Sequence, residues 1–99
     1  MEDFLYYNDL FDIYGDLLTD NEKENFLEYY QEDLSLSEIA SNKNVSRNAI
    51  HKTLKVVIDK LNNYEAKLHV YEMKQALNEA IELENISEIK NKLKTIIDK

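Results

Sequence analysis

Residues 35–60 read SLSEIASNKNVSRNAIHKTLKVVIDK and decide the fold, because two short helical patterns meet there at a tight polar junction. Leu36 and Ile39 form an apolar face on the first pattern, at the spacing of an α-helix. Ser35 and Glu38 have the spacing of a capping box, in which each side chain satisfies a free backbone N–H at the helix start. The stretch therefore predicts a helix that begins immediately after Ser35.

The junction itself, Lys43-Asn44-Val45, predicts a sharp turn. Asn44 stands where such a turn needs a positive φ, and asparagine is the best non-glycine residue for that conformation. We expect Val45 to plug the junction and Ser46 to cap a second helix. The small side chain of Ala40 allows the two helices to cross closely. Together these features predict a helix-turn-helix.

The second helix of this motif combines a buried stripe with a basic outer face. The apolar positions that recur at helical spacing are Ile50, Leu54, Val57 or Ile58, and Leu61. The residues expected to contact a nucleic acid are Ser46, Arg47, Asn48, His51, Lys52 and Lys55. Their cationic side chains suit phosphate or base edges, and Asn48 and His51 supply hydrogen bonds. The alternative is a helical hairpin that crosses at an alanine and serves only as a scaffold.

The composition predicts an all-α chain in one domain. The 99 residues include no proline and one glycine, and 43% are hydrophobic, which suits a small fold with a modest core. We expect one helical domain over residues 1–99, with the helix-turn-helix at about 35–61 and a helical extension at about 64–98. The absence of cysteine excludes disulfides, thiolate metal ligands and a cysteine nucleophile.

Charge is segregated along the chain. Residues 1–34 hold eleven acids and one base, net −10, whereas residues 35–60 hold five bases and two acids, net +3. Residues 61–99 hold six bases and seven acids, net −1, which gives −8 for the whole chain. A polyanion would be repelled by the first third and attracted to the middle, which predicts oriented and salt-sensitive binding. The alternative for the acidic third is a solvated surface.

Two helices are expected before the motif. The first spans Phe4 to Leu18, and Thr19 with Glu22 forms a second capping box that opens a helix to about Gln31. The second helix is rich in aromatic residues. Because their surroundings are acidic, we expect these rings to lie in the core with their hydroxyls at the surface, instead of stacking on bases.

The helical pattern continues after the motif. Asn62-Asn63 is the expected hinge before a helix from about Tyr64 to Glu84, whose apolar residues need either the first helix or a second subunit as a partner. The second possibility would make the chain a homo-oligomer. A last amphipathic helix follows a third capping box at Asn85 and Glu88, and packing is favoured over a role as a membrane-surface or nucleic-acid arm.

The chain offers no recognisable catalytic, cofactor or metal motif. Its carboxylates fall mainly on outward helix positions, where no burial tunes them for acid or base chemistry. His51 and His69 lie on separate predicted helices, and one glycine cannot build a phosphate-binding loop. We therefore expect a protein that is not an enzyme and needs no cofactor. The acidic start at Met1 lacks the features of a signal peptide, and no apolar stretch approaches a membrane span, so a cytoplasmic location is expected.

Several segments between Asp9 and Tyr71 together resemble the YlxM family of small bacterial proteins. They are Leu17-Leu18-Thr19, Tyr29-Tyr30, Asp33-Leu34-Ser35-Leu36-Ser37-Glu38-Ile39-Ala40, Asn44-Val45-Ser46-Arg47-Asn48-Ala49-Ile50 and Tyr64-Glu65-Ala66-Lys67-Leu68. The helix-turn-helix is similar to region 4 of bacterial sigma factors, which many regulators share. Relatives often have proline at Asp20, glycine at Asn44 and an apolar residue at Lys43. An acid suits a helix start and asparagine tolerates a positive φ, so the first two departures are compatible with the fold.

The resemblance implies an all-helical accessory or regulatory protein of the signal recognition particle pathway, since genes of this family typically lie beside those for the particle's GTPase and its receptor. The implied partners are the particle's RNA, DNA near its genes, or the GTPase. A rival to nucleic-acid binding is a protein-interaction module whose acidic first helices dock the GTPase, and a third interpretation is a transcription regulator. The basic helix suits a DNA major groove or an irregular RNA surface equally, so the sequence leaves the target open.

Overall fold

The computed structural model describes residues 3–98, and the regular elements in this range are all helices. The elements are α1 (Phe4–Tyr14), the short 3-10 helix η1 (Gly15–Leu17), α2 (Asp20–Tyr30), α3 (Leu36–Lys43), α4 (Arg47–Leu68), α5 (Val70–Ile81) and α6 (Ile86–Ile97). No strand occurs among residues 3–98, so the predicted all-α fold is confirmed. Within the same range, every helix is too short or too polar to cross a lipid bilayer.

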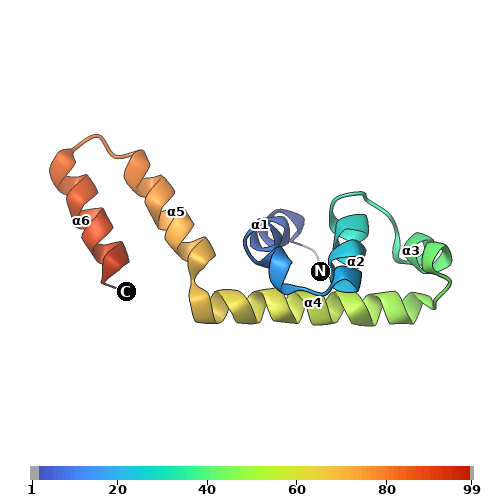
Figure 1. Cartoon of the computed structure of the whole chain (residues 1–99). Helices are drawn as coiled ribbons and strands as arrows, with labels where there is room; N and C mark the ends of the chain where they lie inside the picture. The colour runs from blue at the N-terminus through green and yellow to red at the C-terminus, as the bar shows by residue number, and fades with distance from the viewer. Residues whose placement is uncertain (1–2, 99) are drawn as a thin grey trace.

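Helix α4 is the axis of the molecule. Figure 1 shows α1, α2 and α3 along one side of α4, whereas α5 and α6 form a hairpin beyond its C-terminal end. The predicted stripe on α4 is buried, and it consists of Ile50, Leu54, Val57, Ile58 and Leu61. The molecule measures 58 × 23 × 19 Å, and its radius of gyration of 17.4 Å exceeds the roughly 13 Å of a compact domain of this length. The main core therefore lies between α4 and the first three helices.

The helix starts follow the predicted caps. At α2, the Thr19 N–H donates to Glu22 Oε1 at 2.8 Å, and the Glu22 N–H donates to Thr19 Oγ1 at 3.2 Å. Ser35 and Glu38 make the same reciprocal pair at α3. At α6 only half of the predicted capping box is present: the Asn85 side chain accepts from the Glu88 N–H at 3.2 Å, without the return bond to the Glu88 side chain in the described structure. Because each cap joins residues three positions apart, sequence alone is enough to place these three starts.

The first helix ends earlier than predicted. The α-helix stops at Tyr14 and continues as η1, because the chain must then turn to bury Leu18 and begin α2. Gly15 is buried at this point, and a Cβ on it would lie 3.2 Å from the ring of Phe11. That ring stacks on Phe26 at a centroid distance of 4.3 Å, so it cannot move away freely. The close approach explains why this position is the chain's single glycine.

The aromatic residues of α2 do lie in the core, but one hydroxyl is not where the sequence predicts it. Tyr30 is buried and its ring stacks on Phe26 at 4.5 Å. Its hydroxyl is also buried and finds no hydrogen-bond partner among the described residues. Burial raises the pKa of this phenol. The expectation of a surface hydroxyl is therefore wrong at Tyr30, because the ring packs against Tyr7 of α1 and Phe26 of α2.

The predicted hinge at Asn62-Asn63 is wrong. Helix α4 continues through both asparagines, which are exposed, because Leu61 on the other face is fully buried and Tyr64 packs against the core. The break comes at His69, whose φ of 55° lies in the left-handed region. The helix expected from Tyr64 to Glu84 is therefore two helices, the end of α4 and the separate α5.

Candidate nucleic-acid interface

The turn between α3 and α4 has the predicted left-handed residue. Asn44 has φ 57° and ψ 44°. Its N–H donates to the carbonyl of Ser41 at 3.3 Å, and the Val45 N–H donates to the carbonyl of Ala40 at 3.0 Å. These two bonds form a Schellman motif, which satisfies the last carbonyls of α3 and fixes where the chain leaves it. Ser46 then caps α4 by accepting from the Ala49 N–H at 3.1 Å.

The crossing of α3 and α4 is close and apolar. Ala40 and Ile39 are buried on α3, and Ile50 is buried on the first turns of α4. The predicted role of the small Ala40 is consistent with this packing. Val45, in contrast, is 47% exposed and does not plug the junction as predicted, because the backbone bonds of the Schellman motif already close the turn.

All six residues predicted to contact nucleic acid are exposed at the N-terminal end of α4, namely Ser46, Arg47, Asn48, His51, Lys52 and Lys55. Positions 48, 51, 52 and 55 follow the three- and four-residue spacing of one helix face. Ser46 and Arg47 extend that face around the start of the helix, where free backbone N–H groups give a partial positive charge. The structure thus brings the predicted residues together on one surface, which we call the basic face.

The five bases of residues 35–60 fall into two groups. Lys43 forms ion pairs with Glu24 at 3.0 Å and Glu28 at 3.9 Å, and Lys60 pairs with Glu22 at 2.8 Å. These two lysines turn toward α2 and are neutralised there. Arg47, Lys52 and Lys55 have no ion pair with any residue in the described part of the chain. Only these three positive charges of the segment remain directed to solvent.

The Glu22–Lys60 pair is part of the α2–α4 packing. Burial opposes ionisation of Glu22, but the hydrogen bonds from Lys60 and from the Thr19 backbone outweigh it and hold the pKa of this carboxyl below its usual value. The carboxylate therefore serves two partners, as the reciprocal cap of α2 and as the counter-ion of Lys60. Lys60 is a structural cation and not a member of the basic face.

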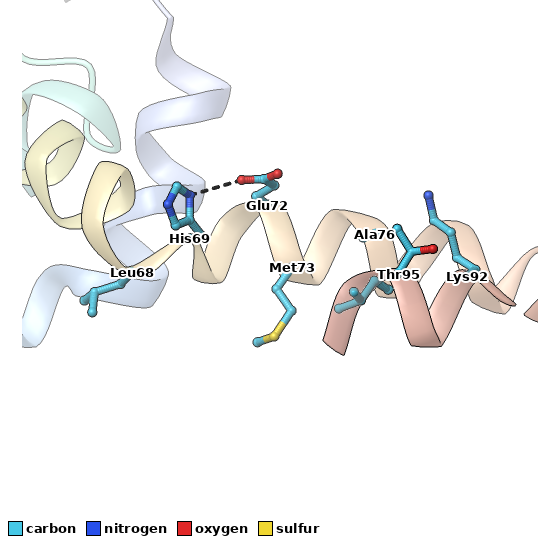
Figure 2. A pocket seen from close by; sticks show the side chains of 8 residues that line it. Leu68, His69, Glu72, Met73, Ala76, Lys92 and Thr95 are labelled. Atoms are coloured by element: carbon cyan, nitrogen blue, oxygen red, sulfur yellow. Dashed lines mark hydrogen bonds and ion pairs between the residues drawn. The ribbon is translucent and has the colours of Figure 1, made fainter. Parts of the chain in front are cut away.

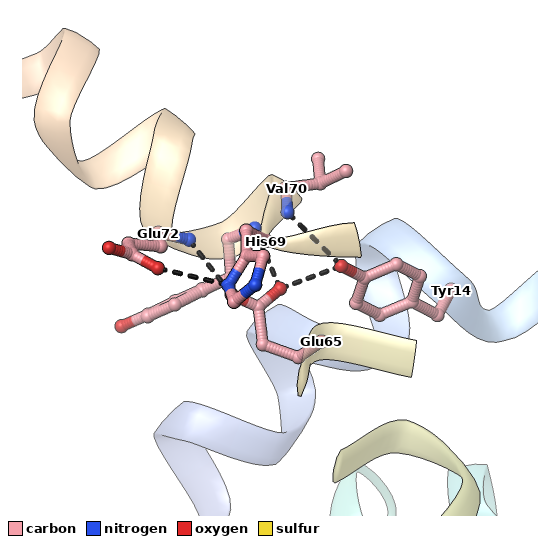
Figure 3. Close-up of polar contacts among 6 residues, drawn as sticks. Tyr14, Glu65, His69, Val70 and Glu72 are labelled. Atoms are coloured by element: carbon pink, nitrogen blue, oxygen red, sulfur yellow. Dashed lines mark hydrogen bonds and ion pairs between the residues drawn. The ribbon is translucent and has the colours of Figure 1, made fainter. Parts of the chain in front are cut away.

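A polar corner that the sequence did not reveal joins α1, α4 and α5 (Figure 3). The Tyr14 hydroxyl donates to Glu65 Oε1 at 2.6 Å and accepts from the Val70 N–H at 3.2 Å. The same Oε1 accepts from the Tyr71 N–H at 2.9 Å, and Oε2 accepts from the Glu72 N–H at 3.0 Å. Glu65 therefore caps α5 from the last turn of α4. Burial and the bond to Glu65 raise the pKa of Tyr14.

The corner also brings together Glu65, His69 and Glu72, whose potential ligand atoms lie within 4.8 Å of one another. The sequence did not reveal this group, because its members lie on either side of the unpredicted helix break at His69. The Glu65 oxygens already accept three hydrogen bonds, and His69 Nδ1 lies 3.1 Å from Glu72 Oε2. The arrangement is that of a helix cap. A cavity of about 380 Å³ lies next to it between α5 and α6 (Figure 2), lined by Leu68, His69, Glu72, Met73, Ala76, Lys92, Thr95 and Ile96.

One family matches the whole chain, and individual relatives match most of it. The sequence profile of UPF0122, described as YlxM/p13-like helix-turn-helix proteins, matches residues 1–99. The chain is 54% identical to a UPF0122 protein of Malacoplasma penetrans over 59 residues, which are 60% of this chain and 55% of that protein. It is 40% identical to one of Fusobacterium nucleatum over 81 residues, 82% of this chain and 79% of that protein. A Ureaplasma urealyticum protein is 46% identical over 87 residues, 88% of each chain.

Proposed function

Because the chain belongs to the UPF0122 family of YlxM/p13-like helix-turn-helix proteins, we propose that it is a non-enzymatic accessory or regulatory protein that binds nucleic acid through the basic face of α4. The family match confirms the resemblance drawn from residues 9–71 and extends it to the C-terminal helices. The binding function, its target and its pathway are our proposal.

The single observation that supports binding is the division of the positive charges. Lys43 and Lys60 are ion-paired with α2, whereas Arg47, Lys52 and Lys55 point to solvent without an ion pair in the described structure. Three unpaired cations at the start of a helix form a surface for phosphate, since each releases a counter-ion when it contacts the polyanion. Asn48 and His51 lie between them and supply hydrogen bonds to base edges or sugar.

The acidic helices limit how a polyanion approaches. Asp9 and Asp12 on α1 and Asp20 on α2 are exposed, and a nucleic acid that crossed α1 would meet these like charges. The basic face lies at the opposite end of α4 from the corner with α5 (Figure 1). Binding is therefore oriented, with the duplex or folded RNA at the N-terminal end of α4.

We place this activity in the signal recognition particle pathway, with the particle's RNA as the first candidate target. Binding is measured at several salt concentrations with that RNA, with duplex DNA from upstream of the gene, and with the particle's GTPase. The proposal expects nucleic-acid binding whose logarithmic affinity falls linearly with the logarithm of salt concentration. Preference for DNA would assign a regulatory role, and binding to the GTPase alone would overturn the proposal in favour of docking through the acidic helices.

The variant Lys52→Ala with Lys55→Ala tests the surface itself. Loss of two phosphate contacts lowers the salt slope by about 1.8, because each contact contributes about 0.9. The matched control is Lys67→Ala with Lys74→Ala, which removes the same charge from exposed positions on α4 and α5, away from the start of α4. An equal effect of the two variants would show that net charge, and not the basic face, governs binding.

A further inference from the structure

The α5–α6 hairpin is a single layer without a second layer to cover it. Helices α5 and α6 have 12 residues each, and Ala80 is the only one of these residues that is buried. Ile81 is 76% exposed, Ile86 70% and Ile97 78%. Stable folds bury the apolar stripe of a helix against another element, so a hairpin with this much open apolar surface is incomplete alone.

The exposed apolar residues lie on one side of the hairpin. On α5, Leu77 follows by one position Ala76, which lines the cavity between the helices, and Ile81 follows by one position the buried Ala80. On α6, Ile97 follows by one position Ile96, which lines the same cavity. A step of one residue turns the side chain by about 100° around each helix. Because α5 and α6 run antiparallel (Figure 1), this turn places the exposed apolar residues of both helices on the same side of the hairpin. The resulting surface, which we call the hairpin face, consists of Leu77, Ile81, Ile86, Leu93 and Ile97.

The hairpin face has the size of an interface. Its five side chains present on the order of 500 Å² of apolar surface, which is near the upper end for the largest patch of an ordinary monomer. A standard interface takes about 800 Å² from each partner, and the polar rim of the two helices supplies the remainder. Exposed apolar residues elsewhere, such as Leu5 and Leu17, belong to other elements of the chain.

The chain's own body does not cover this face. The hairpin leaves α4 at His69, and hydrogen bonds among Tyr14, Glu65 and the first turn of α5 hold it in that direction. The elongated shape, 58 Å in its longest dimension, reflects this geometry. Folding the hairpin back onto α1–α4 would require these bonds to break.

The charges of the hairpin fit a second copy of the same hairpin. Residues 70–84 contain four acids and one base, whereas residues 86–97 contain three lysines and one glutamate. An ion pair between the acidic α5 and the basic α6 already exists within the chain, where Lys92 pairs with Glu79 at 2.8 Å. In a two-fold arrangement, α5 of one copy lies against α6 of the other, and acidic and basic helices then face each other twice. The acidic α1–α2 region, in contrast, repels itself.

We propose that the hairpin face pairs with the same face of a second copy of this chain and forms a four-helix bundle. In such a bundle, the stripes of both hairpins become a shared core. This inference does not depend on nucleic-acid binding, because the face is on the far side of the corner from α4's basic end. Either proposal can therefore fail without the other.

The test is the mass of the full chain in solution, measured by sedimentation equilibrium across a wide range of concentrations without nucleic acid. The expected mass is twice that of one 11.7 kDa chain, and the dimer persists at high salt because its core is apolar. A monomer at every concentration would overturn the proposal. If that monomer then sedimented with anionic lipid vesicles, the face would be a lipid-binding surface instead.

A charge-neutral pair of variants locates the interface. Ile86→Glu with Ile97→Lys places an acid at the start and a base at the end of α6, where the helix dipole favours them, and leaves the net charge unchanged. Its control is Leu5→Glu with Leu17→Lys, at positions that are 82% and 56% exposed outside the hairpin. The first variant is expected to be monomeric with unchanged helical circular dichroism, and the control dimeric. Equal dimerisation of both variants would place the interface elsewhere.

Discussion

The hydroxyl of Tyr14 donates a 2.6 Å hydrogen bond to the carboxylate of Glu65 and joins α1 to the last turn of α4. The same hydroxyl accepts from the Val70 N–H, so this side chain of α1 contacts both α4 and α5. Tyr14→Phe keeps the ring but removes the hydroxyl that bonds the Glu65 carboxylate and the Val70 N–H. We expect unfolding by denaturant to show a loss of about 1–2 kcal/mol, as for a partly buried hydrogen bond to a charged group.

The control for Tyr14→Phe is Tyr29→Phe. The Tyr29 ring also packs against aromatic neighbours, but its hydroxyl makes no hydrogen bond within the described residues. This variant should change the free energy of unfolding by less than about 0.5 kcal/mol. Equal losses in the two variants would mean that the Tyr14 hydroxyl contributes nothing specific to the corner.

The left-handed backbone at Asn44 predicts different effects of two small substitutions on stability. Its φ of 57° carries no steric cost for glycine, so Asn44→Gly should leave stability nearly unchanged. Asn44→Ala places a Cβ without a local hydrogen-bonding side chain in the left-handed region and should cost about 1 kcal/mol. Thermal unfolding of both variants checks this order, which a more stable alanine variant would contradict.

Glu22 makes stability depend on pH in the acid range. Its folded pKa lies below the ordinary value of 4.5, so its contribution is fully present above pH 4.5 and is lost as the pH falls through the lower, folded pKa. Glu22→Gln should therefore be less stable than the unmodified chain at neutral pH, and the difference should shrink in acid. Denaturation curves at several pH values measure it, and a difference that stays constant would refute the coupling.

The buried Tyr30 hydroxyl predicts a substitution that does not destabilise. It has no hydrogen-bond partner in the described structure, so Tyr30→Phe removes an unsatisfied polar group and keeps the ring stacked on Phe26. We expect a gain of up to about 1 kcal/mol by denaturant unfolding. Tyr30→Leu, which loses the ring, should instead cost stability. A clear loss in the phenylalanine variant would show that the hydroxyl has a partner such as bound water.

Sequence predicted the features that depend on near neighbours. The caps at Thr19, Ser35 and Ser46 and the left-handed Asn44 each involve residues within a few positions, and the buried stripe of α4 follows from spacing. Helical spacing also predicted which residues form the basic face. Spacing could not show that Lys43 and Lys60 are ion-paired, because the partners of these two lysines lie on α2, more than ten positions away.

The helix break at His69 could not be predicted from neighbouring residues. Asn62-Asn63 carries the composition of a hinge, yet helix α4 is held straight there by the packing of Leu61. His69 carries no strong turn signal, yet the chain turns there with a positive φ. The cost of that conformation is offset by the hydrogen bonds of Glu65 and by Tyr14, which lies 51 positions before Glu65 in sequence. Such a contact has no signature in a single sequence.

The uninterrupted length of α4 has a mechanical consequence. Its 22 residues make a rod of about 33 Å, with the cationic surface at one end and the corner at the other. Over that span, each degree of tilt at the corner displaces the opposite end by about 0.6 Å. A change in the angle between α4 and the hairpin therefore moves Arg47, Lys52 and Lys55 relative to the hairpin. The side chains around these three residues need not move relative to α4.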